Sequence, residues 1–435
     1  MQKILSILSV VLGAGVAACS ASPEALSGSS TSAVESEKAA ALEKKAADIW
    51  DVAWSRFYSP KTHIFYDYIS SYEAGKGLSH LPVPSEIAEN YPSPGGQGSG
   101  MEDGMILAGI MLGAIVDMHA VTGDDSLKAR ARDVFKGIEL AESIYGHGYI
   151  PRSVCPFDGK SAFLSTSRDQ VTHAVHGMWK YFRSPLADAD AKARIAALTS
   201  RIADRMIENV TPETGWDFLQ PDGLACPLGH CKMWNVKPHE AARLPMIYAA
   251  AWEMTGRRAY LDAYRKFAKD AIEISAAVPS GNPAWTELQM QCSLEVLAAV
   301  ETDPVLKAKI SATMKKLAGY ASIKISRCLK NYETFDADMS MLGPDWRKAS
   351  EWNVRAGGYR FPRLGAYHKV WYLSREMGES GLVVLTAGKS CATPADISAL
   401  QYAMLNTDYF KSSSCGILYH LACYWLARKK GAFPR

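Results

Sequence analysis

The chain has 435 residues, 48 basic and 45 acidic side chains, and a formal net charge of +3. This near balance, without a basic block, argues against nucleic acid as a partner, because nucleic-acid-binding surfaces carry clustered Lys and Arg. The chain is rich in aromatic residues, with 11 Trp and 20 Tyr. Such side chains are common both in sugar-binding clefts and in large hydrophobic cores.

The first residues follow the pattern of a secretory signal. Lys3 precedes an apolar run, and small residues then lead to Cys19. The stretch from Val16 to Cys19 resembles the bacterial lipobox, in which cleavage precedes the cysteine and a lipid is attached to it. The resemblance implies a signal peptide over residues 1–18 and a lipid on Cys19. The alternative is an ordinary signal peptide with an incidental cysteine.

Residues 19–35 are rich in Ser, Ala and Gly and lack apolar periodicity, which predicts a flexible lipidated tether. We therefore expect the protein in the bacterial cell envelope, at the outer membrane on its periplasmic side or surface. Contact with the membrane is expected through the N-terminal lipid only.

Helical periodicity then repeats through residues 36–435. Twelve helices are predicted, over residues 36–57, 101–121, 126–143, 167–183, 187–209, 238–255, 257–276, 284–300, 304–320, 361–377, 394–406 and 412–429. Apolar helices alternate with amphipathic ones, and tight turns near Gly123, Gly256 and Asp303 separate them.

The alternation predicts six helical hairpins that must bury their faces against each other. The apolar member of each pair should lie inside, and the amphipathic member outside. We expect an all-α fold, a single (α/α)6 toroid over residues 36–435, with only minor β-hairpins in its loops. An open helical solenoid is the alternative.

Polar residues collect where the inner helices begin, so they should meet at one rim of the ring. Asp103 and Asp169, at the openings of neighbouring inner helices, are the candidate catalytic carboxylates. The candidate substrate-binding residues are Glu102, Arg168, Gln170, His173, Trp234, Asn235, His239, Glu240, Trp285, Trp352, Arg355, Tyr359, Arg360 and Arg363. Acids in a first helical turn are often only caps, but caps do not require Arg or Trp.

Asp169, His173 and His176 share one face of an otherwise apolar helix. That face either lines a wet pocket, forms a buried network or holds a metal ion. A lone helical triplet is weak evidence for a metal, so we expect neither a metal nor a cofactor. No serine or cysteine has the surroundings of a catalytic nucleophile.

These residue types suit acid/base chemistry on a sugar. Glycoside hydrolysis needs carboxyl groups at the scissile bond, one of them kept protonated by its surroundings. Arginines such as Arg168, Arg355 and Arg360 are suited to hold a carboxylate in a bidentate manner. The sequence therefore favours an acidic, uronic-acid-containing oligosaccharide or polysaccharide as substrate.

The chain resembles the six-hairpin glycosidase superfamily, and within it the unsaturated glucuronyl and rhamnogalacturonyl hydrolases or a related β-glucuronidase. The resemblance rests on Glu102-Asp103-Gly104, the apolar helix after it, and the turn Thr122-Gly123-Asp124. It implies that Asp169 is the acid/base and that Asp103 assists. The surroundings of Asp169, Ser-Arg-Asp-Gln, depart from that family's pattern.

Three other functions stay open. A polysaccharide lyase on the same fold would use Asn235, His239 or an arginine to offset the uronate charge and Tyr359 or His239 as base. An epimerase is the second alternative. A non-catalytic glycan-binding lipoprotein is the third, and it would tolerate loss of Asp103 and Asp169.

Eight cysteines follow Cys19. Cys226 and Cys231 flank a short loop, and this spacing favours a local disulfide. The alternative is a metal site that also uses His230, but a second ligand pair is missing.

Overall fold

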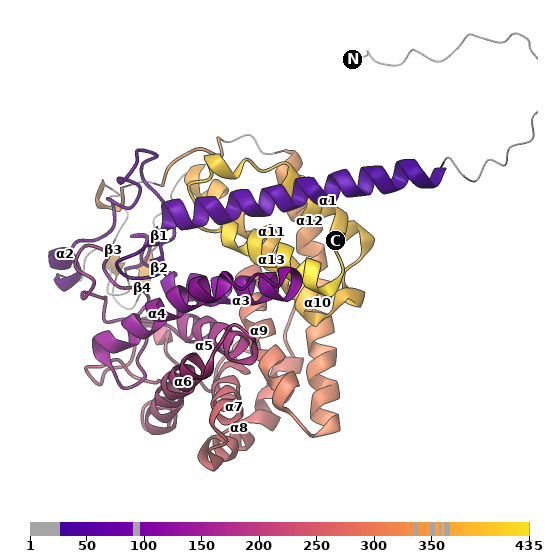
Figure 1. Cartoon of the computed structure of the whole chain (residues 1–435). Coiled ribbons are helices and arrows are strands. Elements are labelled where there is room, and N and C mark those ends of the chain that lie inside the picture. Colours follow the sequence, from indigo (N-terminus) through magenta and orange to yellow (C-terminus); the bar gives the residue numbers. More distant parts are fainter. Residues whose placement is uncertain are drawn as a thin grey trace, which may run out of the picture.

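The computed structural model describes residues 27–89, 96–334, 338–343, 345–348, 353–355, 358–360 and 366–434. Twelve long helices form its body, and Figure 1 shows their arrangement. They are α1 (Ser27–Val52), α3 (Gly104–Thr122), α4 (Leu127–Tyr145), α5 (Arg168–Arg183), α6 (Ala189–Asn209), α7 (Arg243–Thr255), α8 (Arg258–Ala276), α9 (Ala284–Val300), α10 (Pro304–Glu333), α11 (Ala366–Ala387), α12 (Pro394–Leu405) and α13 (Ile417–Lys430).

The shorter elements lie between the long helices. They are η1 (Ala53–Phe57), α2 (Pro84–Ala88), η2 (Pro227–Gly229), η3 (Trp346–Lys348), η4 (Lys389–Cys391) and η5 (Tyr409–Lys411). Two antiparallel hairpins are present, β1 (Tyr58–Ser59) with β2 (Ile64–Phe65), and β3 (Asn353–Arg355) with β4 (Gly358–Arg360). The prediction of a helical fold with only minor hairpins is confirmed for the described residues.

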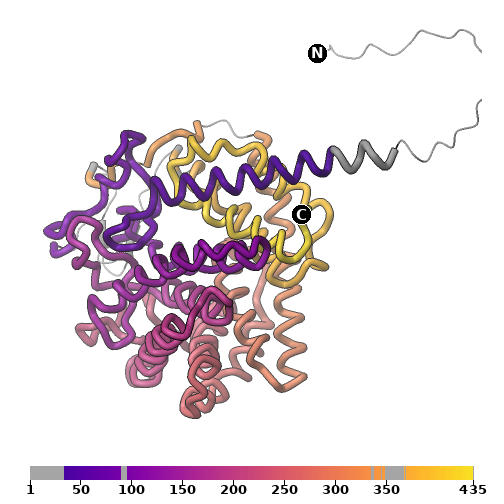
Figure 2. The backbone as a smooth tube through the Cα atoms, viewed as in Figure 1, coloured from indigo at the N-terminus to yellow at the C-terminus, as the bar shows by residue number. Residues whose placement is uncertain are grey.

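Six helices form a closed inner ring. In the order α3, α5, α7, α9, α11 and α13, each packs against the next, and α13 packs back against α3. The outer helices α4, α6, α8, α10 and α12 follow their inner partners, and α1 lies against α12 and α13. The C-terminal helices, yellow in Figure 2, therefore lie beside the indigo N-terminal helix. The chain is an (α/α)6 toroid, and the alternative of an open solenoid is wrong.

Glycines set the closest approach in the ring, between α3 and α5. A Cβ at Gly109 would lie 2.0 Å from the carbonyl oxygen of His173, and one at Gly177 would lie 2.6 Å from Gly109 Cα. Gly378 of α11 packs in the same way on the backbone of α13, 2.5 Å from the Tyr419 carbonyl carbon. Because a methyl group does not fit at these places, the inner helices need glycine there to pack backbone to backbone.

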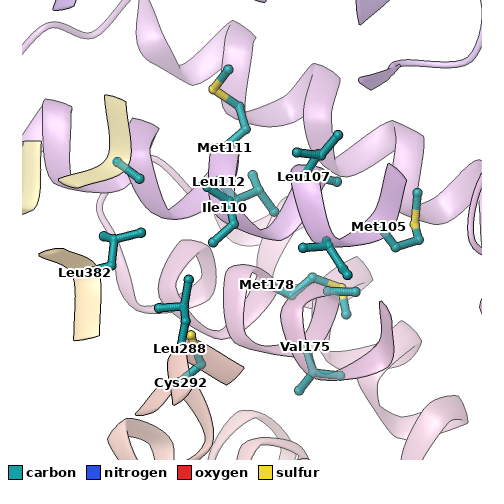
Figure 3. Close-up of a cluster of buried hydrophobic side chains, with 14 of the residues drawn as sticks. Met105, Leu107, Ile110, Met111, Leu112, Val175, Met178, Leu288, Cys292 and Leu382 are labelled. Carbon is teal, nitrogen blue, oxygen red and sulfur yellow. The ribbon is translucent and has the colours of Figure 1, made fainter. Parts of the chain in front are cut away.

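Apolar side chains fill the interior of the ring. Figure 3 shows Ile110 and Leu112 of α3 above Leu288 of α9, with Leu382 of α11 beside them. All four are less than a tenth exposed. The ring is therefore a packed core rather than a tunnel, so a site for a ligand is confined to its rims.

Of the described helices, α3 alone is long and apolar enough by composition to cross a membrane. Its side chains are mostly buried between α5 and α13, which accounts for their apolar character.

A buried ionic group joins three inner helices at the rim opposite their starts. Asp117 of α3, 2% exposed, accepts from Lys180 of α5 at 2.6 Å and from Lys429 of α13 at 2.7 Å. One carboxylate therefore links two neighbouring seams of the ring.

Several helix boundaries differ from the predictions, and α13 begins at Ile417 rather than at residue 412. α1 begins at Ser27, so part of the expected tether is helical, and α7 begins at Arg243 because residues 238–242 form turns. α10 continues to Glu333, since Ile325 and Cys328 carry its buried stripe onward. α11 runs from Ala366 to Ala387 and so extends beyond the expected end at residue 377.

Cys226 and Cys231 form a disulfide, with their Cα atoms 5.4 Å apart. This confirms the predicted local pair over the alternative of a metal site with His230. The loop that it closes contains η2 and leads to the residues before α7.

Candidate active site

The six inner helices bring polar side chains to one layer at the rim where they begin. Each helix supplies one member, and Asp103 is the N-cap residue of α3. In ring order the members are Asp103, Asp169, Arg243, Gln289, Arg375 and Tyr419. We call these six residues the polar layer. The hydrogen bonds within it divide into two groups, one on each side of the ring.

The first group joins α5, α7 and α9. Arg243 pairs with Asp169 through one terminal nitrogen and donates through the other to Gln289 Oε1 at 2.5 Å. The Arg243 side chain is 1% exposed, whereas that of Asp169 is 25% exposed. The buried cation therefore holds a carboxylate that solvent reaches.

The second group joins α3, α11 and α13. Arg375 lies 3.3 Å from Asp103 Oδ2, donates to Glu379 at 2.8 Å and donates to the Tyr419 hydroxyl at 3.1 Å. Arg375 is 6% exposed, and the side chain of Asp103 is 17% exposed. The arrangement repeats that of the first group, with a partly exposed carboxylate held by a buried guanidinium.

The charges around Asp169 keep it ionised. Burial alone would raise its pKa, but the positive charges of Arg243, Arg168 and Arg152 outweigh burial and lower the pKa to about 2. A carboxyl group with this pKa is a base or an electrostatic partner at neutral pH rather than a proton donor.

His173 lies one turn along α5 from Asp169 and faces both groups. Burial lowers its pKa to about 3, and the charges of Arg243 and Arg375 contribute in the same direction. Its Nδ1 is buried without a hydrogen-bond partner among the described residues. The imidazole is therefore neutral, and both buried guanidinium groups act on it.

A protonatable pair lies beside Asp103. Asp67 Oδ2 accepts from the backbone N–H of Glu102 at 3.0 Å and of Asp103 at 3.2 Å, and the Asp67 and Glu102 carboxyl groups are hydrogen-bonded to each other. Burial and the charge of Asp103 raise the pKa of Glu102 to about 7, and burial and Glu102 raise the pKa of Asp67 well above its usual value. The pair carries a proton at mildly acidic pH.

The structure thus brings four predicted residues, Glu102, Asp103, Asp169 and His173, to the polar layer or its border. Three more predicted residues, Arg168, Glu240 and Gln170, are engaged in structural contacts. Arg168 binds Glu240 Oε1 through Nε at 2.8 Å and the carbonyl oxygen of Gly229 at 2.6 Å. Gln170 is fully buried and accepts from the N–H groups of Met105 and Ile106 at 3.2 Å each, which caps α3.

The predicted residues before α7 and α9 lie around the rim. His239 Nε2 is 3.7 Å from Glu240 Oε1, and burial lowers the pKa of His239. Trp234 packs edge-on against Phe267 of α8 with ring centroids 4.8 Å apart. Asn235 is exposed, and Trp285 is half-buried in the first turn of α9.

The remaining predicted residues follow α10. Trp352 and Arg363 lie outside the described residues. Arg355, Tyr359 and Arg360 belong to β3 and β4, for which the structure describes the backbone. Their contribution to substrate binding stays a prediction.

The contacts do not support the alternative of a metal site on α5. Asp169 pairs with Arg243, and His176 Nε2 lies 2.8 Å from Glu295 Oε2 of α9. Within the described residues, Asp169, His173 and His176 do not converge as a ligand set.

The sequence did not point to four members of the polar layer, Arg243, Gln289, Arg375 and Tyr419, or to Glu379 and Asp67 beside it. A signal was present for Arg375 and Glu379, because two opposite charges one turn apart in an apolar helix indicate a buried pair. Arg243 is likewise a lone charge at the start of an apolar helix. Asp67 precedes the first inner helix by more than thirty residues, and only folding reveals its place.

No protein-family model matches the chain, and no curated protein matches it. A sugar epimerase from a ruminal bacterium is 13% identical, with 83% of this chain and 85% of that chain covered and a TM-score of 0.42. A cellobiose 2-epimerase from Spirochaeta thermophila is 13% identical, with 82% and 99% covered and a TM-score of 0.39. An alpha-1,6-mannanase from a Salegentibacter species is 12% identical, with 79% and 99% covered and a TM-score of 0.34. Similarities this distant carry no argument about chemistry, which rests on the site itself.

Proposed function

We propose that the chain is a carbohydrate-active enzyme, a glycoside hydrolase that uses carboxylate acid/base catalysis at the polar layer. One observation carries the proposal. Two partly exposed carboxylates, Asp103 and Asp169, face the rim from neighbouring inner helices, each held by a buried arginine, with the protonatable Glu102 beside them. Carboxyl groups whose surroundings drive their pKa values apart are the usual means of dividing acid and base roles.

The roles follow from the charges. Glu102, with its pKa near neutrality, donates a proton to the leaving oxygen of the glycosidic bond. Asp169, ionised through Arg243, accepts a proton from the attacking water, so that one proton enters and one leaves per bond cleaved. This reverses the role that the family resemblance implied for Asp169, since a pKa of about 2 makes it a poor proton donor.

An acidic sugar is the substrate class that we propose for this site. The guanidinium groups of Arg152 and Arg243 both act on Asp169, so positive charge exceeds negative charge there. The Nε atoms of both arginines are buried without a hydrogen-bond partner among the described residues. A uronate carboxylate would offset this excess at the exposed side of Asp169.

The test compares wild type with Asp169→Asn on a panel of uronic-acid oligosaccharides. Released reducing ends and the ultraviolet absorbance of the unsaturated uronyl group are followed together. A glucuronidase releases sugar without changing the absorbance, an unsaturated-uronyl hydrolase consumes it and a lyase creates it. We expect release without creation of the chromophore, and loss of turnover in Asp169→Asn.

Circular dichroism must show that the variant is folded. Wild-type turnover in a folded Asp169→Asn variant would remove this residue from the mechanism. Growth of the chromophore in wild type would instead establish a lyase.

We also propose that the protein is tethered to the bacterial envelope by a lipid on Cys19. The proposal rests on the small residues that precede this cysteine. Cells fed an alkyne-labelled fatty acid should label the wild-type chain and not Cys19→Ser. Equal labelling of both chains would contradict the proposal.

A further inference from the structure

A small cavity lies between the inner helices α11 and α13 and the outer helix α12, outside the packed interior of the ring. Its volume is about 10 Å³, which is the room that one water molecule or one metal ion needs. None of the six residues of the polar layer lines it. The side chains that define its chemistry are Met377, Met404, His420 and Cys423. We call it the sulfur cavity.

His420 of α13 brings a polar nitrogen to the sulfur cavity. The residue is 2% exposed, and its Nδ1 lies 2.8 Å from the hydroxyl oxygen of the buried Tyr409. Nε2, on the other side of the imidazole, is buried without a hydrogen-bond partner among the described residues. A buried polar atom without a partner is costly. An occupant of the cavity that binds Nε2 would therefore stabilise the fold.

The other side chains bring sulfur to the same cavity. Cys423 carries a free thiol and lies one turn after His420, so the two residues share a face of α13. A Cβ at Gly381 of α11 would lie 2.5 Å from Cys423 Sγ, which places the thiol against α11. Met377 lies one turn before Gly381 on that face, and Met404 lines the cavity from α12. Three helices therefore surround the cavity with one nitrogen ligand and three sulfur ligands.

Water suits the sulfur cavity poorly. A buried water molecule usually makes about three hydrogen bonds with polar groups. Among the described side chains that line the cavity, His420 Nε2 is the one strong partner, because thiols and thioethers bond only weakly. The cavity therefore suits an occupant that binds nitrogen and sulfur together.

The ligand types favour a soft monovalent metal ion. Thiolate and thioether groups select copper(I) among the common metals, and imidazole binds copper as well. With the thiolate of Cys423 and a neutral His420, copper(I) forms a site of zero net charge, as apolar surroundings require. A divalent ion such as Zn²⁺ would leave one positive charge, and no carboxylate of the described lining offsets it.

We infer that the sulfur cavity is a copper(I) site, in which His420 Nε2 and Cys423 Sγ bind the ion and Met377 and Met404 add thioether sulfur. The thiol releases its proton to solvent as the bond between copper and sulfur forms, and no electron is transferred. His420 Nδ1–H then donates to the Tyr409 hydroxyl oxygen, which fixes the orientation of the ring.

This copper(I) site does not rest on the proposed hydrolysis. It departs from the expectation of no metal, which considered ligands that are close together in the chain. Here the ligands come from three helices, and the chain must fold before they meet. A bound ion would join α11, α12 and α13 through their side chains.

The first experiment is competition for copper(I) in the absence of oxygen. The folded chain is equilibrated overnight with the copper(I) complex of bicinchoninate, whose absorbance falls as the protein takes the ion. We expect one tightly bound ion per chain. Tyr409→Phe, which removes the hydroxyl behind His420, should weaken binding by about 10–100-fold. Cys423→Ser removes a ligand itself and should weaken binding further.

Two further variants give the matched comparison. Met404→Leu nearly conserves volume but removes a sulfur atom, so it should fold and bind copper(I) more weakly. Cys415→Ser removes another buried thiol that does not line the cavity, and it should bind as wild type does. Circular dichroism checks the fold of every variant.

The second experiment needs no variant. X-ray absorption at the copper edge of the loaded wild type should show both nitrogen and sulfur neighbours. Copper(I) should also raise the melting temperature of the wild type, because a ligand that binds the folded state stabilises it. The increase should be absent from folded Cys423→Ser.

Two results would overturn the inference. One is wild-type affinity for copper(I) in folded Cys423→Ser, with binding lost instead in Cys391→Ser, whose thiol is half-buried outside the cavity. The other is a spectrum of the loaded wild type that contains sulfur neighbours but no nitrogen. Both results leave the acid/base proposal for Asp169 standing.

Discussion

Arg243 binds Asp169 and Gln289 at once, so that one buried guanidinium ties α5, α7 and α9 together at the rim. The same contact leaves Asp169 ionised and partly exposed. Stability and chemistry are therefore coupled at this pair. Removing the carboxylate disturbs both, and the two effects need separate measurements.

The coupling predicts a stability cost for Asp169→Asn. It leaves the charge of Arg243 buried without its counter-ion, so the free energy of unfolding should fall by about 3 kcal/mol. The double variant Asp169→Asn/Arg243→Gln should recover part of this loss, because it buries no charge. Urea denaturation of the wild type, the two single variants and the double variant gives the four free energies of unfolding that a double-mutant cycle needs. Additive losses would show that the pair is not coupled.

The contact between α3 and α5 predicts opposite signs for two glycine substitutions. Gly109→Ala forces a methyl group against the His173 carbonyl oxygen and should destabilise the protein by about 1–3 kcal/mol. Gly319→Ala, on the exposed face of α10 with nothing within 4 Å of the new Cβ, should stabilise it by about 0.5–1 kcal/mol. Thermal unfolding of both variants is the measurement. A neutral Gly109→Ala would show that the two backbones are not in contact.

The ionic group at the opposite rim predicts a large effect for Asp117→Asn. This change leaves Lys180 and Lys429 facing each other, and Lys180 is nearly buried. We expect a loss of about 3 kcal/mol in the free energy of unfolding. Asp125→Asn removes an exposed partner of Lys128 and should cost less than about 0.5 kcal/mol. Similar losses in both variants would contradict the buried role of Asp117.

The raised pKa of Glu102 predicts a pH-dependent difference between wild type and Glu102→Gln. A carboxyl group with a raised folded-state pKa stabilises the fold below its unfolded value, and this contribution is lost as pH rises toward the folded value. The wild type should therefore lose melting temperature relative to Glu102→Gln as pH rises from 4.5 to about 7. The comparison with the variant removes the contribution of the buried histidines, which runs in the opposite direction. A constant difference across this range would mean that Glu102 titrates normally.

The pH dependence of the catalytic rate is a second measurement of the titration of Glu102. If Glu102 donates the proton, the rate should decline as pH passes about 7, while Asp169 stays ionised throughout. A decline in rate at acidic pH should then not come from protonation of Asp169, because the pKa of this residue is about 2. A rate that is flat from pH 6 to pH 8 would exclude Glu102 as the donor.

The ring of helices could be predicted from the sequence because each helix and turn is marked by residues that lie close together in the chain. Inner helices are buried on all sides and are therefore apolar, whereas outer helices are buried on one side and are amphipathic. Residues such as Gly123 and Gly256 mark the turns between them. The end of α10 was misplaced because Ile323 and Ser326 lower helix propensity, whereas burial of Ile325 keeps the helix intact.

The site was predicted only in part, for a physical reason. Asp169 was visible as an acid opening an apolar helix. Its partner Arg243 lies 74 residues later, and Arg375 lies 272 residues after Asp103. Only the closed ring shows which of the many charges meet, and the same contacts pair Arg168 with Glu240.

The seam between α13 and α3 joins the last helix of the chain to one of the first. During synthesis, the flank of α3 that meets α13 therefore stays uncovered until α13 has been made. A nascent chain that stops before Ile417 has no way to shield this flank, and the bond between Asp117 and Lys429 does not form. A chain that lacks α13 therefore exposes an apolar flank of α3 that the closed ring buries.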